Sequence, residues 1–212
     1  MSWGGEFEGK SVIEIFEPGK RLRTTWPSTI QDGGKPAELA VDYHLEGKGG
    51  RTVLRLVHSG FGRGAAWDEE YEGVQNGWTF ELRSLRHYLE HHLGRDRHVV
   101  FVVGPPSDLA GPAVWKRVVG DGFGVPDPAS LSEGDRYSFP VGEGTVFEGT
   151  VLDHKPSRQL AMTVDGLDNG IFRIEVFAAR PHLWLATWGD AAAVQPFETP
   201  WREMLKGLLA KT

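Results

Sequence analysis

The amino-acid sequence predicts an α+β protein made of two related units, each an antiparallel β-sheet followed by an amphipathic helix. Three observations lead to this prediction. Short runs rich in β-branched and aromatic residues are separated by Gly- and Pro-containing turns, which is typical of strands. The apolar period changes to that of a helix near Gly77 and again near Thr199. The two halves also resemble each other. We expect unit one to span residues 1–95 and unit two residues 96–212.

Unit one starts directly with strands. The turn at residues 17–20 contains Pro18 and Gly19, and residues 31–36 are expected to form a loop. A helix is expected from Gly77, because the residues at its apolar positions follow steps of four, three and four. The predicted strands are residues 11–16, 21–26, 39–46 and 51–58, and the predicted helix stripe is Trp78, Leu82, Leu85 and Leu89.

Unit two has an extra strand and helix in front of its sheet. The strand is residues 98–103, and the helix begins at Ser107 or Asp108 and runs to about residue 119. Residues 120–134 are expected to form a loop. The closing helix starts at Thr199-Pro200, since proline suits the first helical position. The remaining predicted strands are residues 136–139, 144–153, 159–164, 171–178 and 183–188, and the closing stripe is Trp201, Met204, Leu205, Leu208 and Leu209.

The internal repeat is visible in two places. Residues 7–22 align with residues 147–160 when two single-residue gaps are allowed, and both read Phe-Glu-Gly, a strand, a proline turn and a strand ending in leucine. The closing helices also match, because each carries a tryptophan followed by leucines four and seven residues later. Two matches in the same order favour duplication over chance similarity of hairpins.

Composition excludes several classes of function. The chain has 212 residues, a formal net charge of −6 and no cysteine. An acidic chain argues against a nucleic-acid groove and against binding to an anionic membrane. The lack of cysteine excludes disulfides and thiolate chemistry. The N-terminus lacks the pattern of a signal peptide, and the longest apolar run, residues 99–103, is too short to span a membrane. We therefore expect a cytoplasmic protein.

No stretch of the sequence carries a recognisable catalytic or cofactor motif. His87 and His91 lie one helical turn apart, with His92 beside them, but a third ligand at motif spacing is missing. The acidic run at residues 68–72 lacks the spacing of a calcium loop and is expected to be a solvated loop leading into the helix. The glycine-rich stretches at residues 59–64 and 120–124 fit neither a phosphate loop nor a dinucleotide fingerprint. We expect no catalytic residue, metal or cofactor.

Large apolar side chains are the candidate ligand-binding residues. Trp78 and Trp201 are expected chiefly to anchor the two helices on their sheets. Trp184 and Trp188 are expected on the same face of a strand, as core or as cavity wall. The residues predicted to contact a ligand are Trp26, Tyr43, Leu54, Trp78, Leu82, Trp184, Trp188 and Trp201.

Three stretches resemble a known family: residues 9–26, residues 51–62 and residues 77–90. They are similar to the SRPBCC (START-like, helix-grip) superfamily, in the branch named for the C-terminal domain of the activator of the heat-shock-protein-90 ATPase. The resemblance is clear over residues 4–93 and fainter in unit two. It implies helix-grip units, each a curved antiparallel β-sheet wrapped around its C-terminal helix. The first unit departs from the family in lacking the front strand and the two short helices.

The resemblance implies a binding function. Family members bind apolar molecules, assist the chaperone or catalyse reactions of apolar substrates, and no catalytic set is common to the branch. Our hypothesis is a non-enzymatic protein that binds an apolar small molecule or regulates a protein partner, such as a chaperone ATPase. The alternative is an enzyme acting on an apolar substrate, for which a desolvated ionisable residue such as His58, His44 or Arg55 is required. Because unit one lacks its front, either unit two or a second copy in a homodimer is expected to cover its edge.

Overall fold

The described part of the chain, residues 10–32, 34–125, 128–142 and 144–210 of a computed structural model, has the predicted α+β architecture. Antiparallel sheets are each followed in the chain by a helix, as in helix-grip proteins. The chain divides into two compact units, Met1–Asn76 and Gly77–Thr212. This boundary lies inside a helix, whereas the sequence repeat suggests a boundary after residue 95. The division into units 1–95 and 96–212, which comes from the sequence repeat, therefore stays a prediction.

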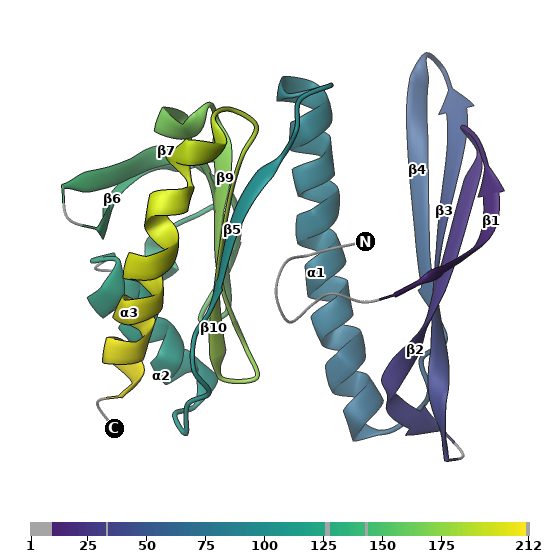
Figure 1. The fold of residues 1–212 in the computed structure, drawn as a ribbon, viewed down its shortest axis with the longest axis horizontal. Helices are drawn as coiled ribbons and strands as arrows, with labels where there is room; N and C mark the ends of the chain where they lie inside the picture. Colours follow the sequence, from purple (N-terminus) through teal and green to yellow (C-terminus); the bar gives the residue numbers. More distant parts are fainter. Residues whose placement is uncertain (1–9, 33, 126–127, 143, 211–212) are drawn as a thin grey trace. The chain divides into compact units, whose positions relative to one another are not determined.

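The first unit contains a four-stranded antiparallel sheet in the order β1-β2-β3-β4 (Figure 1). Its strands are β1 (Val12–Glu17), β2 (Arg21–Asp32), β3 (Lys35–Lys48) and β4 (Arg51–Ser59). The predicted loop at residues 31–36 is largely incorporated into β2 and β3, which pair as far as Asp32 and Lys35. The sequence missed this extension because Pro27 and Pro36 argue locally against strands. A register shift between Pro27 and Gln31 accommodates the irregularity.

Helix α1 (Ala65–His91) follows β4 and is longer than predicted. We expected it to begin at Gly77, so the acidic residues 68–72 lie within the helix and not in a loop. Acidic side chains near a helix N-terminus interact favourably with the helix dipole, which explains why this polar stretch can be helical. Within the first unit, Trp67 anchors the first turns of α1, since its side chain is buried and its ring meets Phe61 edge-on.

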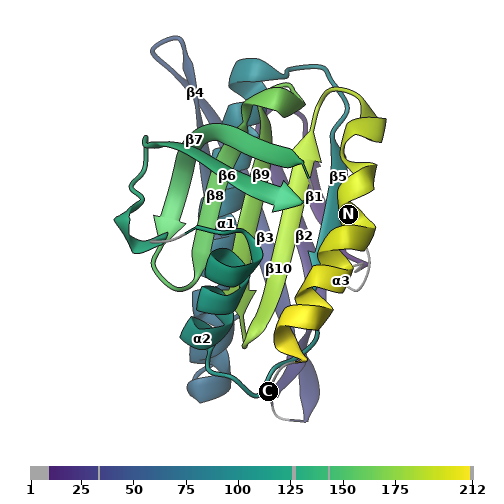
Figure 2. The ribbon, with the colours of Figure 1, turned by 90° about the vertical axis from the view of Figure 1, so that its left-hand side faces the viewer.

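The second unit contains a six-stranded antiparallel sheet in the order β5-β10-β9-β8-β7-β6 (Figure 2). Strand β5 (His98–Val103), which precedes the rest in the chain, pairs with β10 (Arg180–Thr187). Strand β5 is therefore part of the second unit's own sheet. The other strands are β6 (Arg136–Gly142), β7 (Thr145–Lys155), β8 (Gln159–Val164) and β9 (Gly170–Phe177).

Helices α2 and α3 lie on one face of this sheet (Figure 2). Helix α2 (Gly111–Trp115) continues as a π-helix, η2 (Lys116–Gly122), and α3 (Glu198–Leu209) closes the chain. The predicted helix at residues 107–119 therefore begins later and extends into the predicted loop. The short 3₁₀ helices are η3 (Pro128–Ser130), η4 (Asp165–Leu167), η5 (Ala191–Ala193) and η6 (Gln195–Phe197). Between the helices and the sheet lies the main hydrophobic core, centred on Trp201 and Phe172.

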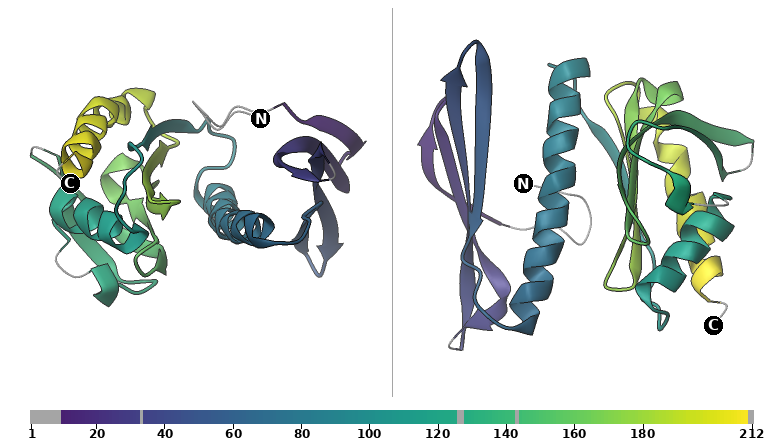
Figure 3. Two further views of the ribbon diagram at one scale, coloured as in Figure 1. Left: turned by 90° about the horizontal axis from the view of Figure 1, so that it is seen from below. Right: turned by 180° about the vertical axis from the view of Figure 1, so that it is seen from behind.

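The opposite face of the second sheet packs against residues 77–91 of α1 (Figure 3). Phe80 is buried and meets the ring of Trp184 edge-on at a centroid distance of 5.2 Å. The face of α1 that is buried here also carries Ser84 and His87. This differs from the expected anchoring stripe, in which Leu82, Leu85 and Leu89 remain 37%, 40% and 53% exposed. Contacts with the second sheet, such as that between Phe80 and Trp184, bury this face of α1, and helical periodicity does not reveal them.

Candidate functional site

The two faces of the first unit's sheet differ sharply in chemistry. Directly paired residues of antiparallel strands share a face. Arg21 pairs with His44, and His44 pairs with Arg55, so one face carries a row of charged side chains. Leu22 pairs with Tyr43, and Tyr43 pairs with Leu56, so the other face carries a row of apolar ones. We refer to these as the charged face and the apolar face of the β1–β4 sheet.

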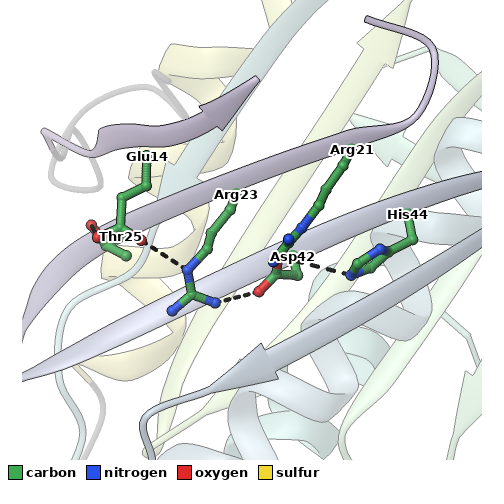
Figure 4. Close-up of polar contacts among 6 residues, drawn as sticks. All are labelled: Glu14, Arg21, Arg23, Thr25, Asp42 and His44. Atoms are coloured by element: carbon green, nitrogen blue, oxygen red, sulfur yellow. Dashed lines mark hydrogen bonds and ion pairs between the residues drawn. The ribbon is translucent and has the colours of Figure 1, made fainter. Parts of the chain in front are cut away.

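Asp42 is the centre of the charged face (Figure 4). Arg21 donates two hydrogen bonds to Asp42 Oδ1, at 3.0 Å from Nε and 2.7 Å from Nη2. Arg23 donates to Asp42 Oδ2 through Nη1, and its Nε donates to Glu14 Oε2 at 2.8 Å. His44 Nε2 lies 3.8 Å from Asp42 Oδ1. These contacts join residues of β1, β2 and β3 in one network.

The arrangement around Asp42 is structural and leaves little room for catalysis. Its side chain is almost completely buried. Burial acts to raise the pKa of Asp42, but hydrogen bonds and charge from Arg21 and Arg23 outweigh it, so the pKa lies below the ordinary value. A carboxylate held ionised by two guanidinium groups is a poor proton acceptor. The network therefore holds three strands in register and is not a general-base site.

The apolar face contains three of the predicted ligand-binding residues. Trp26, Tyr43 and Leu54 lie on β2, β3 and β4, and each side chain is half-buried. At the β1 edge of the same face, Ile13 and Phe16 are 62% and 68% exposed. An exposed apolar surface of this kind is typical of a binding surface.

His58 is a titratable residue of the apolar face. It pairs with Val41, and its ring lies between Trp26 and Phe61 at centroid distances of 5.3 Å and 4.8 Å. Burial among these rings lowers the pKa of His58 to about 4. The imidazole is therefore neutral at physiological pH. Phe61 was not among the predicted ligand-binding residues, but it completes this aromatic group. It also contacts Trp67 and Tyr71 of α1 edge-on.

The other predicted ligand-binding residues lie elsewhere. Trp201 is in the main core of the second unit and is 1% exposed. Trp184 and Trp188 share a face, as expected, and belong to the cluster with Phe80 under α1. Trp78 and Leu82 lie on α1 itself. The structure thus places Trp26, Tyr43 and Leu54 on one face of the first unit's sheet, whereas Trp184, Trp188 and Trp201 take part in the packing of the second unit.

The histidines of α1 take part in packing in the second unit. His87 Nε2 and His92 Nε2 lie 2.7 Å and 3.3 Å from the carbonyl oxygen of Asn169, and the ring of His92 stacks on Trp188 at 4.4 Å. Burial lowers the pKa of both His87 and His92. Among the described residues, no group of three or more His, Asp or Glu side chains has the geometry to hold a metal ion.

A polar network, which the sequence did not reveal, is buried on the α1-facing side of the second sheet. Arg173 donates to Gln159 Oε1 at 2.6 Å, and Gln159 donates to Asp153 Oδ2 at 2.5 Å. The guanidinium carbon of Arg173 lies 4.3 Å from the ring centroid of Phe80. Glu175 also pairs with Arg173 at 2.9 Å. Every charge in this network has a partner, so it fixes the packing of α1 on the sheet.

Comparison with known proteins supports the class of protein that the fold indicates. Residues 1–90 match the family described as Activator of Hsp90 ATPase homolog 1-like protein. This match covers the region in which the sequence resembles the SRPBCC branch named for that activator, so the predicted resemblance is confirmed. No curated protein matches the chain significantly. In the described part of the chain, no helix combines the length and the apolarity needed to cross a membrane.

Three solved structures show weak overall similarity. The protein MLL2253 from Mesorhizobium loti is 16% identical, with a TM-score of 0.37, over 54% of this chain and 98% of its own. DynU16, a protein in the dynemicin biosynthetic locus, is 20% identical, with a TM-score of 0.32, over 94% and 76%. The di-domain ARO/CYC StfQ from the steffimycin biosynthetic pathway is 10% identical, with a TM-score of 0.28, over 93% and 70%.

Proposed function

We propose that this chain is a non-enzymatic, cytoplasmic SRPBCC-type protein that binds an apolar small molecule or regulates a protein partner. The observation that carries the proposal is the apolar face of the β1–β4 sheet, which Trp26, Tyr43 and Leu54 share and on which none of them is fully buried. Partly exposed apolar surface gains free energy when a ligand or partner removes it from water. Trp78 and Leu82 of α1 remain proposed ligand contacts. Trp184, Trp188 and Trp201 are proposed to support the fold.

The electrostatics of the apolar face favour an uncharged ligand. His58 lies on this face, and with a pKa of about 4 it carries no charge at neutral pH. The charged side chains Arg21, Arg23, Asp42 and Glu14 belong to the other face and form ion pairs with one another. A polar or ionic ligand would lose hydration on the apolar face without gaining a charged partner.

We expect the neutral dye Nile red to bind this face, and Leu54→Asn to weaken binding about tenfold, because burial of a leucine contributes about 1.5–3 kcal/mol. The matched control is Val53→Asn, since Val53 is the neighbouring residue of β4 and belongs to the charged face. Fluorescence titration measures both affinities. Native mass spectrometry of freshly purified protein tests for a co-purified apolar ligand. Equal effects of the two substitutions, or no binding of dye or ligand, would reject this binding face.

The enzyme alternative has one specific observation in its favour, which is the desolvated His58. A general base is most effective when its pKa is close to the working pH, and a pKa of about 4 makes His58 a weak base. The two functions differ in the fate of the ligand. A binding protein returns an apolar ligand intact after incubation. Chemical conversion of the ligand that stops in His58→Gln would favour the enzyme.

Regulation of a chaperone is supported by the match of residues 1–90 to the family described as Activator of Hsp90 ATPase homolog 1-like protein. The expected result is a change in the ATPase rate of purified heat-shock-protein-90 when the chain is added. Because partner binding would use the exposed apolar face, Leu54→Asn should reduce this change more than Val53→Asn. An unchanged ATPase rate across all protein ratios would limit the proposal to small-molecule binding.

A further inference from the structure

The outer edge of strand β4 has the features of a sheet edge that can accept a further strand. Strand β4 is the last strand in the order β1-β2-β3-β4, and no strand among the described residues pairs with its outer side. Its nine residues pair with β3 without a register shift, and they include no proline or glycine. Proteins normally protect a free edge with bulges, prolines or short strands, because an open edge recruits another strand. Strand β4 has none of these three features, and its charged residues Arg51 and Arg55 restrict the registers in which another strand can pair.

The opposite edge of the same sheet is protected. Strand β1 has six residues and a register shift between Ile13 and Ile15. At the shift, Glu14 is held by Arg23 at 2.8 Å. A bulge and a fixed charge on an edge strand both hinder further pairing. The sheet therefore has one blunted edge and one edge suited to accept a strand.

The second unit shows what occupies the corresponding edge. Strand β10 is the last strand before the closing helix α3, just as β4 is the last strand before α1. Strand β10 is paired on both sides, with β9 on one and β5 on the other, and β5 is antiparallel to it. By the internal repeat, the outer edge of β4 corresponds to the edge of β10 that β5 occupies, and no strand of the described residues occupies it. The occupant that fits this edge is an extended strand running antiparallel to β4.

We propose that a second copy of this chain supplies that strand, so that β4 pairs with β4 of the second copy across a two-fold axis. An antiparallel strand is self-complementary under such an axis. Two registers are favourable. When the axis passes through Leu54, Arg55 lies opposite Val53 of the second copy. When it passes through Leu56, Arg55 lies opposite Val57 of the second copy. A register centred on Arg55 would oppose like charges and is disfavoured.

In the resulting dimer, the outer edge of β4 is paired in both copies. It forms a continuous sheet with four strands from each copy, and both of its ends are the bulged strand β1. Val53 and Val57, which are 45% and 36% exposed in the single chain, become cross-strand contacts. This inference does not rest on the ligand-binding proposal, because it uses the edge of the sheet and not its apolar face.

The test is a charge swap at the β4 edge. The double variant Val53→Lys/Val57→Lys places lysine opposite Arg55 of the second copy in either register, and we expect its dimer dissociation constant to rise about tenfold or more. Adding Arg55→Glu to the double variant creates opposite charges at the same contacts and should restore the dimer. The control is Val12→Lys, because Val12 is 65% exposed on the charged face but lies on β1. Sedimentation velocity over a concentration series measures all four proteins.

Three outcomes would overturn the proposal. They are a wild-type chain that stays monomeric at its highest soluble concentration, a double variant that dimerises like wild type, and a folded triple variant in which the dimer is not restored.

A second measurement is needed if the double variant does not melt cooperatively. Hydrogen exchange of the wild-type chain, measured at low and at high protein concentration, then takes the place of the comparison with the double variant. Protection of residues 51–59 should then rise with concentration, and constant protection contradicts the dimer. A chain lacking residues 1–9 should dimerise like wild type. Dimerisation that appears only after their removal means that these residues cover the edge.

Discussion

At the scale of single residues, Trp201 shows how one side chain organises a unit. It lies on α3, its Nε1 donates to the carbonyl oxygen of Val141 at 2.8 Å, and its ring contacts Phe172 at 4.9 Å. The indole is therefore both buried in apolar contacts and satisfied in its hydrogen bond, which is the combination that makes buried tryptophan favourable. This residue couples the closing helix to β6 and β9 of the second sheet.

We expect Trp201→Ala to destabilise the second unit by about 3–5 kcal/mol, because a buried tryptophan leaves a large cavity when it is removed. Arg202→Ala is the control, since Arg202 is the next residue of α3 and is exposed beside Glu198. Its effect should stay within about 0.5 kcal/mol. Urea denaturation followed by circular dichroism measures both. A loss of less than about 1 kcal/mol at Trp201 would show that the core relaxes around the cavity.

At the scale of elements, helix α1 is the least predictable part of the protein. It runs continuously through Gly73 and Gly77, and the boundary between the compact units falls next to Gly77. A β-carbon at Gly77 would meet no atom within 4 Å, so packing does not require glycine there. Glycine inside a helix costs about 0.5–1 kcal/mol relative to alanine. The middle of α1 is therefore a locally weak helix whose ends are held by separate sets of contacts.

Gly77→Ala should raise the stability of α1 by about 0.5–1 kcal/mol, because alanine has the higher helix propensity and the site is open. The contrasting variant is Gly62→Ala, in which the new methyl group would overlap the indole ring of Trp67. That change should be destabilising. Thermal melting monitored at the helical circular-dichroism band measures both signs. Destabilisation by Gly77→Ala would mean that this position needs the flexibility of glycine.

At the scale of the whole molecule, buried neutral histidines make stability depend on pH in both units. Burial lowers the pKa of His58 in the first unit and of His182 in the second unit to about 4. The unfolded chain binds protons at these histidines near pH 6.5, whereas the folded chain does not. The stabilisation is therefore fully present above pH 6.5 and is lost as the pH falls towards 4.

We expect His182→Phe to remove part of this pH dependence. Between about pH 7 and about pH 5, His182 should account for a loss of about 2 kcal/mol in the free energy of unfolding. Urea denaturation over this range, on wild type and variant, measures the difference. His91→Gln is the control, because the side chain of His91 is exposed to solvent. An identical pH slope in wild type and His182→Phe would show that His182 does not carry the effect.

The amino-acid sequence by itself determined the local elements of this protein. Alternating apolar residues and proline or glycine turns specified strands such as β5, β8 and β10, and the leucine spacing specified α3. Family resemblance over the first 90 residues was also recognisable. These features depend on neighbours a few residues apart, so a single sequence contains the information needed to predict them.

Tertiary structure alone decided which surfaces meet. It placed Asp42 between two arginines, buried Phe80 and His87 of α1 in place of the leucine stripe, and paired β5 with β10. It also gathered Trp26, His58 and Phe61 on one apolar face while leaving Trp201 in a separate core. Each of these outcomes joins residues far apart in the chain through burial and hydrogen bonding. Local periodicity carries no record of such partners, because it is set by contacts within one element.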